Sequence, residues 1–368
     1  MTNNNDKKVL NVPLLRFPEF TEEWKEHCLA EYLDFKNGLN PSANKFGSGI
    51  KFISVMDILN NNFITYDCIR TSVKITPEEQ VAFAVEKGDM LFQRSSETLE
   101  DVGRANVYMD ENPAVFGGFV IRGKKKTEYN PMFFRYLLAS PYARKKIIPM
   151  GAGAQHFNIG QDGLSKVKLH FPILQEQQKI AALLRLIDER ITTQNKIIEK
   201  LETLIKGIIE TVISSQKPNT FIKNCLECDS STLQESQVAE NGAYPVYGAT
   251  GINGYTETAD VNGEAILITK DGSGVGTVKF ADGEYSYIGT LNRLIAREGY
   301  CLKYLYFALQ GFYFEPYKTG MAIPHIYFKD YGKAKIFCPT IEEQSIIAKS
   351  LSVIENKFNL SKIVYIMI

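Results

Sequence analysis

The sequence has little that would support catalysis. Its 368 residues include four histidines, at positions 27, 156, 170 and 325. None of their spacings is typical of a metal site or of a nucleophile–base–acid triad. No serine stands in the glycine-flanked turn of a hydrolase, and no glycine-rich loop follows an N-terminal strand to hold a cofactor. We therefore expect no catalytic site, no bound metal and no cofactor in this chain.

Overall charge and long apolar segments are also lacking. The 42 basic and 42 acidic side chains give a formal net charge of zero, so any site for a polyanion must depend on local clustering. No apolar run reaches the roughly 18 residues of a membrane span. Among the six cysteines, Cys225-x-x-Cys228 has no second pair with which to bind zinc. These features predict a cytoplasmic protein with reduced thiols.

What the sequence does contain is an internal repeat. The segment PILQEQQKIAALLRLIDERI (172–191) is followed, 167 residues later, by PTIEEQSIIAKSLSVIENKF (339–358). Over 172–189 and its counterpart, seven of eighteen positions are identical, where average residue usage predicts about one. Weaker similarity connects 87–95 with 262–270. A fixed offset of this kind indicates duplicated architecture.

Each copy opens a predicted helix whose apolar residues are spaced alternately by four and three, as in a coiled-coil seam. The seam positions of the first helix are Ile180, Leu184, Ile187, Ile191, Gln194, Ile198, Leu201, Ile205, Ile208 and Val212; those of the second are Ile347, Leu351, Ile354, Phe358, Ser361, Tyr365 and Ile368. A polar residue interrupts both seams at the same place. If the helices pair antiparallel with these interruptions together, Gln194 faces Ser361, Ile208 faces Ile347 and Ile187 faces Ile368. The alternative is that each helix packs only on its own globular body.

We predict a mixed α/β fold in which two bodies are joined by a long antiparallel two-helix coiled-coil spacer. The expected boundaries are 1–171 and 217–338 for the bodies, and 172–216 and 339–368 for the helices. Short strands are predicted at 50–55, 90–92, 105–108, 118–121, 167–171, 265–269, 276–280, 293–296 and 334–337, and short helices within 130–147 and 302–312. The glycines of DGSGVG (271–276) predict a tight turn, because the alternating residues after them are typical of a strand.

Local charge suggests one face for a polyanion. Eight basic residues between 121 and 150, among them Lys124, Lys125 and Lys126, accompany one acidic residue, Glu128, while the acidic residues of this body cluster between 78 and 101. A solvated surface helix would explain the basic stretch equally well. Two glycine loops, GAGAQHFN (151–158) and GMAIPH (320–325), stand at equivalent places and differ in sequence. Variable loops on a repeated scaffold favour the recognition of two different ligands.

The segment GAGAQHFNIGQDGLSKVKLHFPILQEQQKIAALLRLIDERI (151–191) closely resembles the first conserved region of type I restriction–modification specificity subunits. In that family a loop and a strand lead into P-x-x-x-EQ-x-x-IA and a long helix. LLRFPEFTEEW (14–24) resembles the usual start of such subunits, and 320–358 carries the pattern in weaker form. The resemblance implies two target-recognition domains that read the halves of a bipartite site in double-stranded DNA. It also implies docking to two modification subunits and to restriction subunits, with the methyl donor and ATP bound by those partners.

The same resemblance implies that the equivalent loops contact DNA. The candidates, together with the three lysines named above, are Gln93, Arg94, Ser95, Gln155, His156 and Asn158 in the first body and Lys270, Ser273, Asn292, Arg293 and His325 in the second. The amides of Gln155 and Asn158 suit adenine, and Arg94 suits guanine. The second helix is about two heptads shorter than the first, which leaves a natural end or a truncation open. Two other functions also stay open: a protein-interaction scaffold without DNA binding, and an intact DNA methyltransferase or nuclease.

Overall fold

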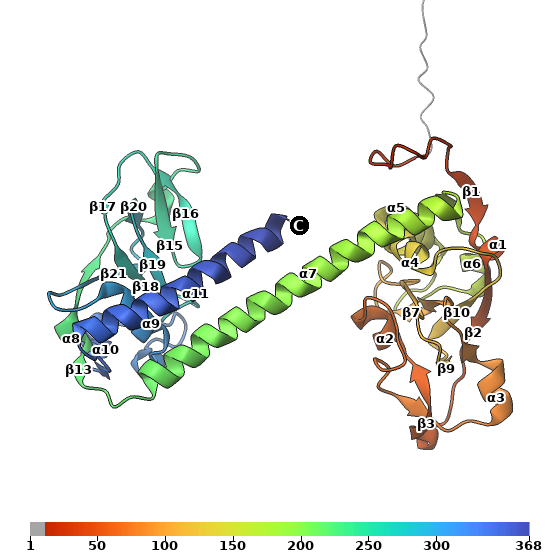
Figure 1. Cartoon of the computed structure of the whole chain (residues 1–368), viewed down its shortest axis with the longest axis horizontal. Coiled ribbons are helices and arrows are strands. Elements are labelled where there is room, and N and C mark those ends of the chain that lie inside the picture. The colour runs from red at the N-terminus through yellow and green to blue at the C-terminus, as the bar shows by residue number, and fades with distance from the viewer. Residues whose placement is uncertain (1–11, 368) are drawn as a thin grey trace, which may run out of the picture. The chain divides into compact units, whose positions relative to one another are not determined.

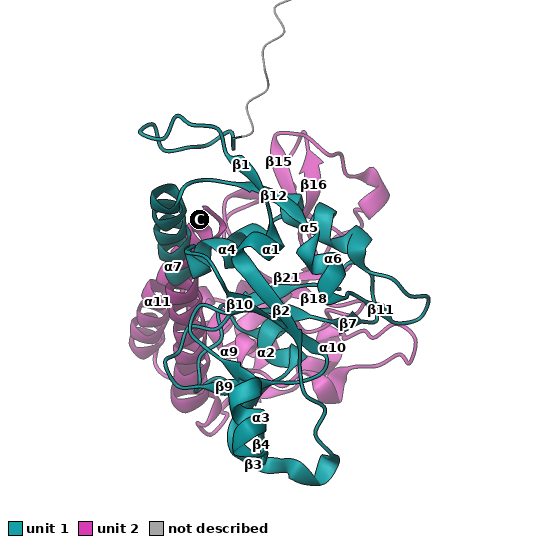
Figure 2. Ribbon diagram, turned by 90° about the vertical axis from the view of Figure 1, so that its right-hand side faces the viewer, with its two compact units in different colours: residues 1–189 teal, residues 190–368 magenta. Residues whose placement is uncertain are grey.

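The computed structural model describes residues 12–367 and divides into two compact units, Met1–Glu189 and Arg190–Ile368 (Figure 2). Both units combine strands with helices, which confirms the mixed α/β class (Figure 1). Over the described range, none of the helices combines the length and apolar character that a bilayer span requires.

Unit 1 contains a four-stranded antiparallel sheet in the order β2-β10-β6-β8. These strands are Leu33–Asn37, Val120–Lys125, Met90–Gln93 and Ala105–Val107. A second sheet has the order β4-β3-β9-β5, in which β3 and β9 are parallel. Its strands are Ser72–Val73, Phe46–Ile53, Ala114–Phe116 and Ala84–Val85. Two short pairs complete the strands: β1 (Lys25–Cys28) with β12 (Lys168–Phe171), and β7 (Ser95–Ser96) with β11 (Phe157–Asn158).

The helices of unit 1 surround these sheets. They are α1 (Leu29–Tyr32), η1 (Ala43–Lys45), α2 (Val55–Asn60), α3 (Pro77–Ala82), α4 (Pro131–Ala139), α5 (Pro141–Ile147), η2 (Ile148–Met150) and α6 (Gln161–Ser165). Helix α4 begins at Pro131, whose fixed φ suits a first helical position, and the side chain of Asn130 caps it by accepting from the Phe133 amide at 2.9 Å. Its buried face packs against the first sheet, in a core that includes Phe92, Phe134 and Phe171.

Unit 2 repeats this topology. Its first sheet has the order β14-β21-β18-β19, again antiparallel, and its second has the order β16-β15-β20-β17, again with one parallel pair. The strands are β13 (Thr220–Phe221), β14 (Leu226–Ser230), β15 (Tyr244–Gly248), β16 (Gly251–Thr256), β17 (Val261–Asn262), β18 (Ala265–Thr269), β19 (Val278–Ala281), β20 (Glu284–Tyr287), β21 (Leu291–Ala296) and β22 (Lys335–Ile336). The short helices are α8 (Ile222–Cys225), η4 (Glu235–Gln237), α9 (Leu302–Gln310), η5 (Glu315–Tyr317) and α10 (Phe328–Tyr331). Duplication therefore extends to the whole strand order of both bodies.

Each of the predicted strands overlaps an observed one, with two notable shifts. Strand β10 begins at Val120 and not at 118, because Gly117 and Gly118 form a turn in which the Val120 amide donates to the Gly117 carbonyl at 2.9 Å. Strand β19 begins at Val278, because Gly276 has a φ of +88° and closes the predicted DGSGVG turn.

The long helix α7 (Leu174–Ile208) continues through a π-helical turn, η3 (Ile209–Ser214). The seam prediction is wrong at Ile187, which is 36% exposed, and at its last position, Val212, which is 37% exposed, whereas Ile209 and Ile213 are buried. The wider π turn rotates the following residues relative to an α-helix, so a different pair of isoleucines faces the core of unit 2.

In unit 2, α11 (Ile341–Met367) runs antiparallel to the second part of α7 (Figure 1). The seam positions from Ile191 to Ile208 and from Ile347 to Ser361 are buried or partly buried, and Tyr365 is 41% exposed. The Gln194 amide donates to the Ser361 carbonyl at 2.8 Å, which confirms that the two polar interruptions meet. Ile208 and Ile347 pack against the same core cluster. The third expected pair is not tested, since Ile368 lies outside the described residues.

Candidate nucleic-acid interface

The structure brings most of the candidate residues of unit 1 together at one end of the first sheet. Strands β7 and β11 pair here, and the Ser95 hydroxyl is hydrogen-bonded to the side-chain oxygen of Asn158. The Gln93 amide donates to the Ser95 carbonyl at 3.0 Å, and the Asn158 amide donates to the His156 carbonyl at 3.3 Å. Gln155 is exposed in the loop between the strands. The two segments, whose paired residues Ser95 and Asn158 are 63 positions apart in sequence, thus form one polar surface.

The equivalent end of unit 2 is built by the DGSGVG turn and the second glycine loop. Asp271 and Thr319 each form a β-bridge with His325. The His325 ring packs edge-on against Tyr327, with centroids 5.1 Å apart, and Ser273 is exposed in the turn. Lys270, immediately before Asp271, completes the group.

Two backbone hydrogen bonds at this end are duplicated. In unit 1 the Arg94 amide donates to the Phe119 carbonyl at 2.8 Å, and the Arg94 carbonyl accepts from Ile159 at 2.9 Å. In unit 2 the Lys270 amide donates to Thr290 at 2.9 Å, and its carbonyl accepts from Ile326 at 2.9 Å. Arg94 and Lys270 therefore occupy the same structural position, which the sequence match of 87–95 with 262–270 missed by one residue.

Both side chains at this position are basic and partly exposed. The Arg94 guanidinium donates to the Gly118 carbonyl at 3.2 Å. Within residues 12–367, neither Arg94 nor Lys270 has a carboxylate within salt-bridge distance. Their charge remains available to a phosphate or a base edge.

The lysines of the basic stretch lie elsewhere. Gln93 pairs with Val120 at the start of β10, whereas Lys124 and Lys125 pair with β2 at its other end. Five residues of strand separate the two places by roughly 17 Å. Lys124 lies 3.4 Å from Glu86, Lys125 lies 2.9 Å from Glu128, and Lys126 donates to the Ala30 carbonyl at 3.0 Å. The predicted site residues of unit 1 are thus two separate groups.

The charges of unit 1 are less segregated than expected. Glu86 pairs with Lys124 at 3.4 Å, and the carboxylate of Asp89 accepts from the backbone amide of Lys125 at 3.1 Å. Acidic and basic segments that are separate in sequence interleave, because strands β6 and β10 are neighbours in the sheet.

Asn292 and Arg293 lie within β21 of unit 2. Asn292 is 4% exposed and accepts from the Ser230 hydroxyl at 3.0 Å, while Arg293 pairs with Asp229 at 3.0 Å. Both side chains thus contact residues of the neighbouring strand β14.

The repeated helix opening fixes each long helix to its body, a role that sequence reasoning missed. Gln177 accepts from the Asn130 amide at 3.0 Å and donates to the Pro172 carbonyl at 2.9 Å. Gln344 makes the same two bonds, to the Cys301 amide at 3.0 Å and the Pro339 carbonyl at 2.9 Å. Both glutamines are 2% exposed. The glutamine of each Glu–Gln pair therefore joins the start of its long helix to the N-terminus of a short helix, α4 in unit 1 and α9 in unit 2.

A tyrosine–carboxylate contact supports the same joint about three helical turns further along each long helix. The Tyr136 hydroxyl donates to Asp188 at 2.7 Å, and the Tyr306 hydroxyl donates to Glu355 at 2.6 Å. Burial, with the adjacent carboxylate, raises the pKa of both phenols above the ordinary value. The acids are 167 residues apart, so this contact belongs to the repeat.

The preceding glutamate is held differently in the two copies. Glu176 is 1% exposed and accepts two bonds of 2.7 Å from Arg16 and one of 3.2 Å from the Trp24 indole. Its counterpart Glu343 accepts from the Thr340 amide at 3.1 Å, a capping contact. The N-terminal segment LLRFPEFTEEW is thereby attached to the start of α7.

No cluster of three or more histidine, cysteine, aspartate or glutamate side chains suited to a metal ion occurs in the part of the chain that the structure describes. Cys225 is buried, and its thiol donates to the Ile222 carbonyl at 3.3 Å. Burial raises the pKa of the Cys228 thiol to about 11.

Known proteins are similar to much of this chain. A family model described as the type I restriction modification DNA specificity domain matches residues 21–203 and 226–365. The chain is 26% identical over 201 residues to the putative type I restriction enzyme MjaX specificity subunit of Methanocaldococcus jannaschii, covering 53% of this chain and 47% of that protein. It is 25% identical over 225 residues to the type I restriction enzyme HindI specificity subunit of Haemophilus influenzae, covering 59% and 46%. The matched region thus spans about half the length of these relatives.

Solved structures show a similar fold. The crystal structure of a type I restriction–modification S subunit from M. genitalium has a TM-score of 0.67 and 15% sequence identity, and the match covers 93% of this chain and 92% of that one.

Proposed function

This chain belongs to the type I restriction modification DNA specificity domain family, and from that premise we propose that it is a non-catalytic adaptor that selects a bipartite site in double-stranded DNA. In this proposal each unit reads one half of the site. Residues 1–171 and 217–338 act as the target-recognition domains. Residues 172–216 and 339–368 act as an antiparallel coiled-coil spacer that sets the gap between the halves.

The observation that carries the proposal is the equivalence of Arg94 and Lys270. Two bodies with the same strand order present a basic side chain at the same position, beside loops that differ in sequence. A shared cation suits the phosphate backbone, which is the same at any site, and the differing loops suit two different base sequences. Gln155 and Asn158 in one unit, and Ser273 and His325 in the other, are the proposed base-reading side chains.

The proposed partners are two modification subunits and restriction subunits. One similar structure, with a TM-score of 0.50, is titled for complex assembly and conformational transition of the type I R-M system. We assign methyl transfer and ATP-driven steps to such partners, and cofactor binding with them.

Methylome sequencing tests this function in cells that express the chain with its modification subunit. The expected result is a split methylated site with a constant gap. Substitutions at Gln155 and Asn158 should alter one half-sequence, and substitutions at Ser273 and His325 the other. Arg94→Ala and Lys270→Ala should weaken methylation at the unchanged site, and Lys126→Ala, directly after β10, tests separately whether the second basic group also contacts DNA.

The spacer is tested separately. Inserting seven residues into both helices lengthens them by about 10.5 Å, which corresponds to about three base pairs of B-form DNA. We expect a longer gap and the same two half-sequences. Altered half-sequences with an unchanged gap would refute the spacer, and methyl transfer by the purified chain alone would refute the adaptor.

A further inference from the structure

A duplicated turn stands beside Arg94 and Lys270. In unit 1 residues 117–120 join β9 to β10, and in unit 2 residues 288–291 join β20 to β21. The backbone hydrogen bonds of the two turns match. The first residue donates to β3 or β15 at 3.0 Å, the fourth donates to the first at 2.9 or 3.0 Å, and the carbonyl of the third accepts from the amide of Arg94 or Lys270 at 2.8 or 2.9 Å. The third residues of the two turns therefore occupy the same structural position.

The side chain at this third position differs between the units. Unit 1 has Phe119, which is 67% exposed. Unit 2 has Thr290, which is partly buried, with its hydroxyl oxygen enclosed. At the end of the sheet where the candidate DNA-contacting loops lie, unit 1 thus exposes an aromatic ring, whereas unit 2 offers neither a ring nor an accessible hydroxyl.

The turn of unit 1 holds the backbone of Phe119 firmly. The Gly38 amide donates to the Val120 carbonyl at 3.2 Å, and the Gly117 amide donates to the Ile53 carbonyl at 3.0 Å. The backbones also approach closely, because a Cβ added at Gly38 would clash with the Gly117 carbonyl oxygen. The exposed ring is therefore presented by a fixed backbone, which lowers the entropic cost of a contact with a ligand.

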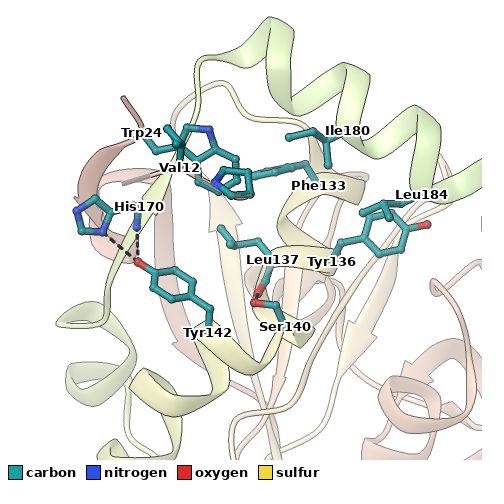
Figure 3. Close-up of a pocket in the computed structure, with 11 residues that line it drawn as sticks. Val12, Trp24, Phe133, Tyr136, Leu137, Ser140, Tyr142, His170, Ile180 and Leu184 are labelled. Atoms are coloured by element: carbon teal, nitrogen blue, oxygen red, sulfur yellow. Dashed lines mark hydrogen bonds between the residues drawn. The ribbon is translucent and has the colours of Figure 1, made fainter. Parts of the chain in front are cut away.

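The surface around Phe119 is apolar. A cavity of about 380 Å³ lies beside the turn, and the exposed side chains of Phe119, Phe46 and Met56 line it. The described residues that line this cavity carry no charge, so it offers little to a phosphate. It is separate from the apolar cavity between α4 and the start of α7, where the His170 amide donates to the Tyr142 hydroxyl at 2.9 Å (Figure 3). That other cavity belongs to the joint between the body and its long helix, whereas the cavity beside Phe119 adjoins the candidate nucleic-acid interface.

We propose that Phe119 determines specificity in the half-site read by unit 1, by packing its ring against the C5-methyl group of a thymine. This inference rests on the proposed reading of DNA and names one base within it. The Arg94 guanidinium donates to the Gly118 carbonyl at 3.2 Å, so a cation lies next to the ring. The cation suits a backbone phosphate, and the ring suits the thymine methyl, which is the apolar group that base edges present in the major groove. Because Thr290 offers no ring, the half-site read by unit 2 has no matching requirement at this position.

The test uses the complex of the full chain with its modification subunit, on a duplex that carries the split site found by methylome sequencing. Each thymine of the site is replaced in turn by uracil, which removes only the methyl group, and Kd is measured at one fixed salt concentration. At one thymine of one half-site, the unsubstituted chain should bind the uracil duplex about three- to fivefold more weakly, the effect of one buried methyl group. Phe119→Ser should weaken binding to the thymine duplex by a similar factor or more, and should abolish the difference between thymine and uracil at that position.

Phe63→Ser is the matched control. Phe63 is 39% exposed and precedes Ile64, which forms a β-bridge with Tyr108 at the opposite end of the first sheet. This variant should keep the discrimination between thymine and uracil, and circular dichroism checks that both variants are folded.

The possible outcomes separate this inference from the function on which it rests. A complex that prefers the split site but binds thymine and uracil alike at every position would overturn the role of Phe119 and leave the adaptor intact. Discrimination that persists in Phe119→Ser would do the same. Loss of the modification subunit from the Phe119→Ser complex would overturn the role in favour of a protein contact, and a complex without any preference for a split site would overturn both proposals.

Discussion

The glutamine of each helix opening should contribute far more to stability than the residue that follows it. In Gln177→Ala, the partly buried Asn130 amide loses its acceptor and the buried Pro172 carbonyl loses a donor. A buried polar group left without a partner costs about 1–3 kcal/mol, and the second bond contributes about 1 kcal/mol. We therefore expect the free energy of unfolding of unit 1 to fall by about 2–4 kcal/mol.

Urea denaturation followed by Trp24 emission measures this loss, because the only tryptophan lies in unit 1. With an m-value of about 1–3 kcal/mol/M, the midpoint should fall by about 0.7 M or more. Gln178→Ala is the matched control: this residue is the next in the chain and is exposed, so its substitution should change stability by less than about 0.5 kcal/mol. Gln344→Ala should lower the unfolding transition of unit 2, observed by circular dichroism. Equal midpoints for Gln177→Ala and Gln178→Ala would show that the duplicated hydrogen bonds do not stabilise the joint.

Three further outcomes can be tested on the purified chain. Gln194→Leu should change the free energy of unfolding by less than about 1 kcal/mol, because the Ser361 carbonyl that loses this donor is part of helix α11. Gln194→Asp should destabilise the protein, because it places a carboxylate in the partly buried seam. Tyr306→Phe should cost about 1–2 kcal/mol in urea and more than Tyr136→Phe, because the side chain of Glu355 is 15% exposed and that of Asp188 is 34% exposed. Burial raises the pKa of Tyr287 to about 12, so the neutral phenol favours the folded state; its contribution to stability should hold below pH 10 and fall between pH 10 and 12, measured as the difference between the urea midpoints of the chain and of Tyr287→Phe across that range.

The long helices could be predicted because their signal is local. The heptad spacing and the polar interruption are written in consecutive residues, and the meeting of Gln194 with Ser361 followed from aligning two copies of one pattern. The end of α7 could not be predicted in this way. The π turn at Ile209–Ser214 shifts which side chains are buried, and nothing in the heptad pattern signals such a turn.

The second sheet of each unit escaped prediction, apart from β3. Strand β16 has the sequence GINGYT and β15 has YPVYG, in which glycine, proline and polar residues hide the alternation of a strand. Strand β16 pairs with β15 in a tight hairpin, and β15 also pairs in parallel with β20, about 40 residues along the chain, so the sheet depends on tertiary pairing that the local sequence does not signal.

The predicted site residues of unit 1 fall into two separate groups for a similar reason. Ser95 and Asn158 were both predicted from loops that the family resemblance implies, and the structure joins them through the pairing of β7 with β11. Lys124–Lys126 were selected from charge density along the sequence, which carries no information on which acids the neighbouring strand contributes. Glu86 and Asp89 meet that stretch only because β6 lies beside β10.

The duplicated anchors and the differing loops separate two tasks that one chain must perform. Gln177 and Gln344 bind backbone groups, an amide and a carbonyl, so their contacts depend little on the side chains around them. The loops near Arg94 and Lys270 lie at the end of β10 and of β21, away from these anchors. Substitutions in a loop can therefore change what a body binds without changing how the body is fixed to its helix. In the proposed adaptor, new half-sites would then arise by loop change while the gap between them stays constant.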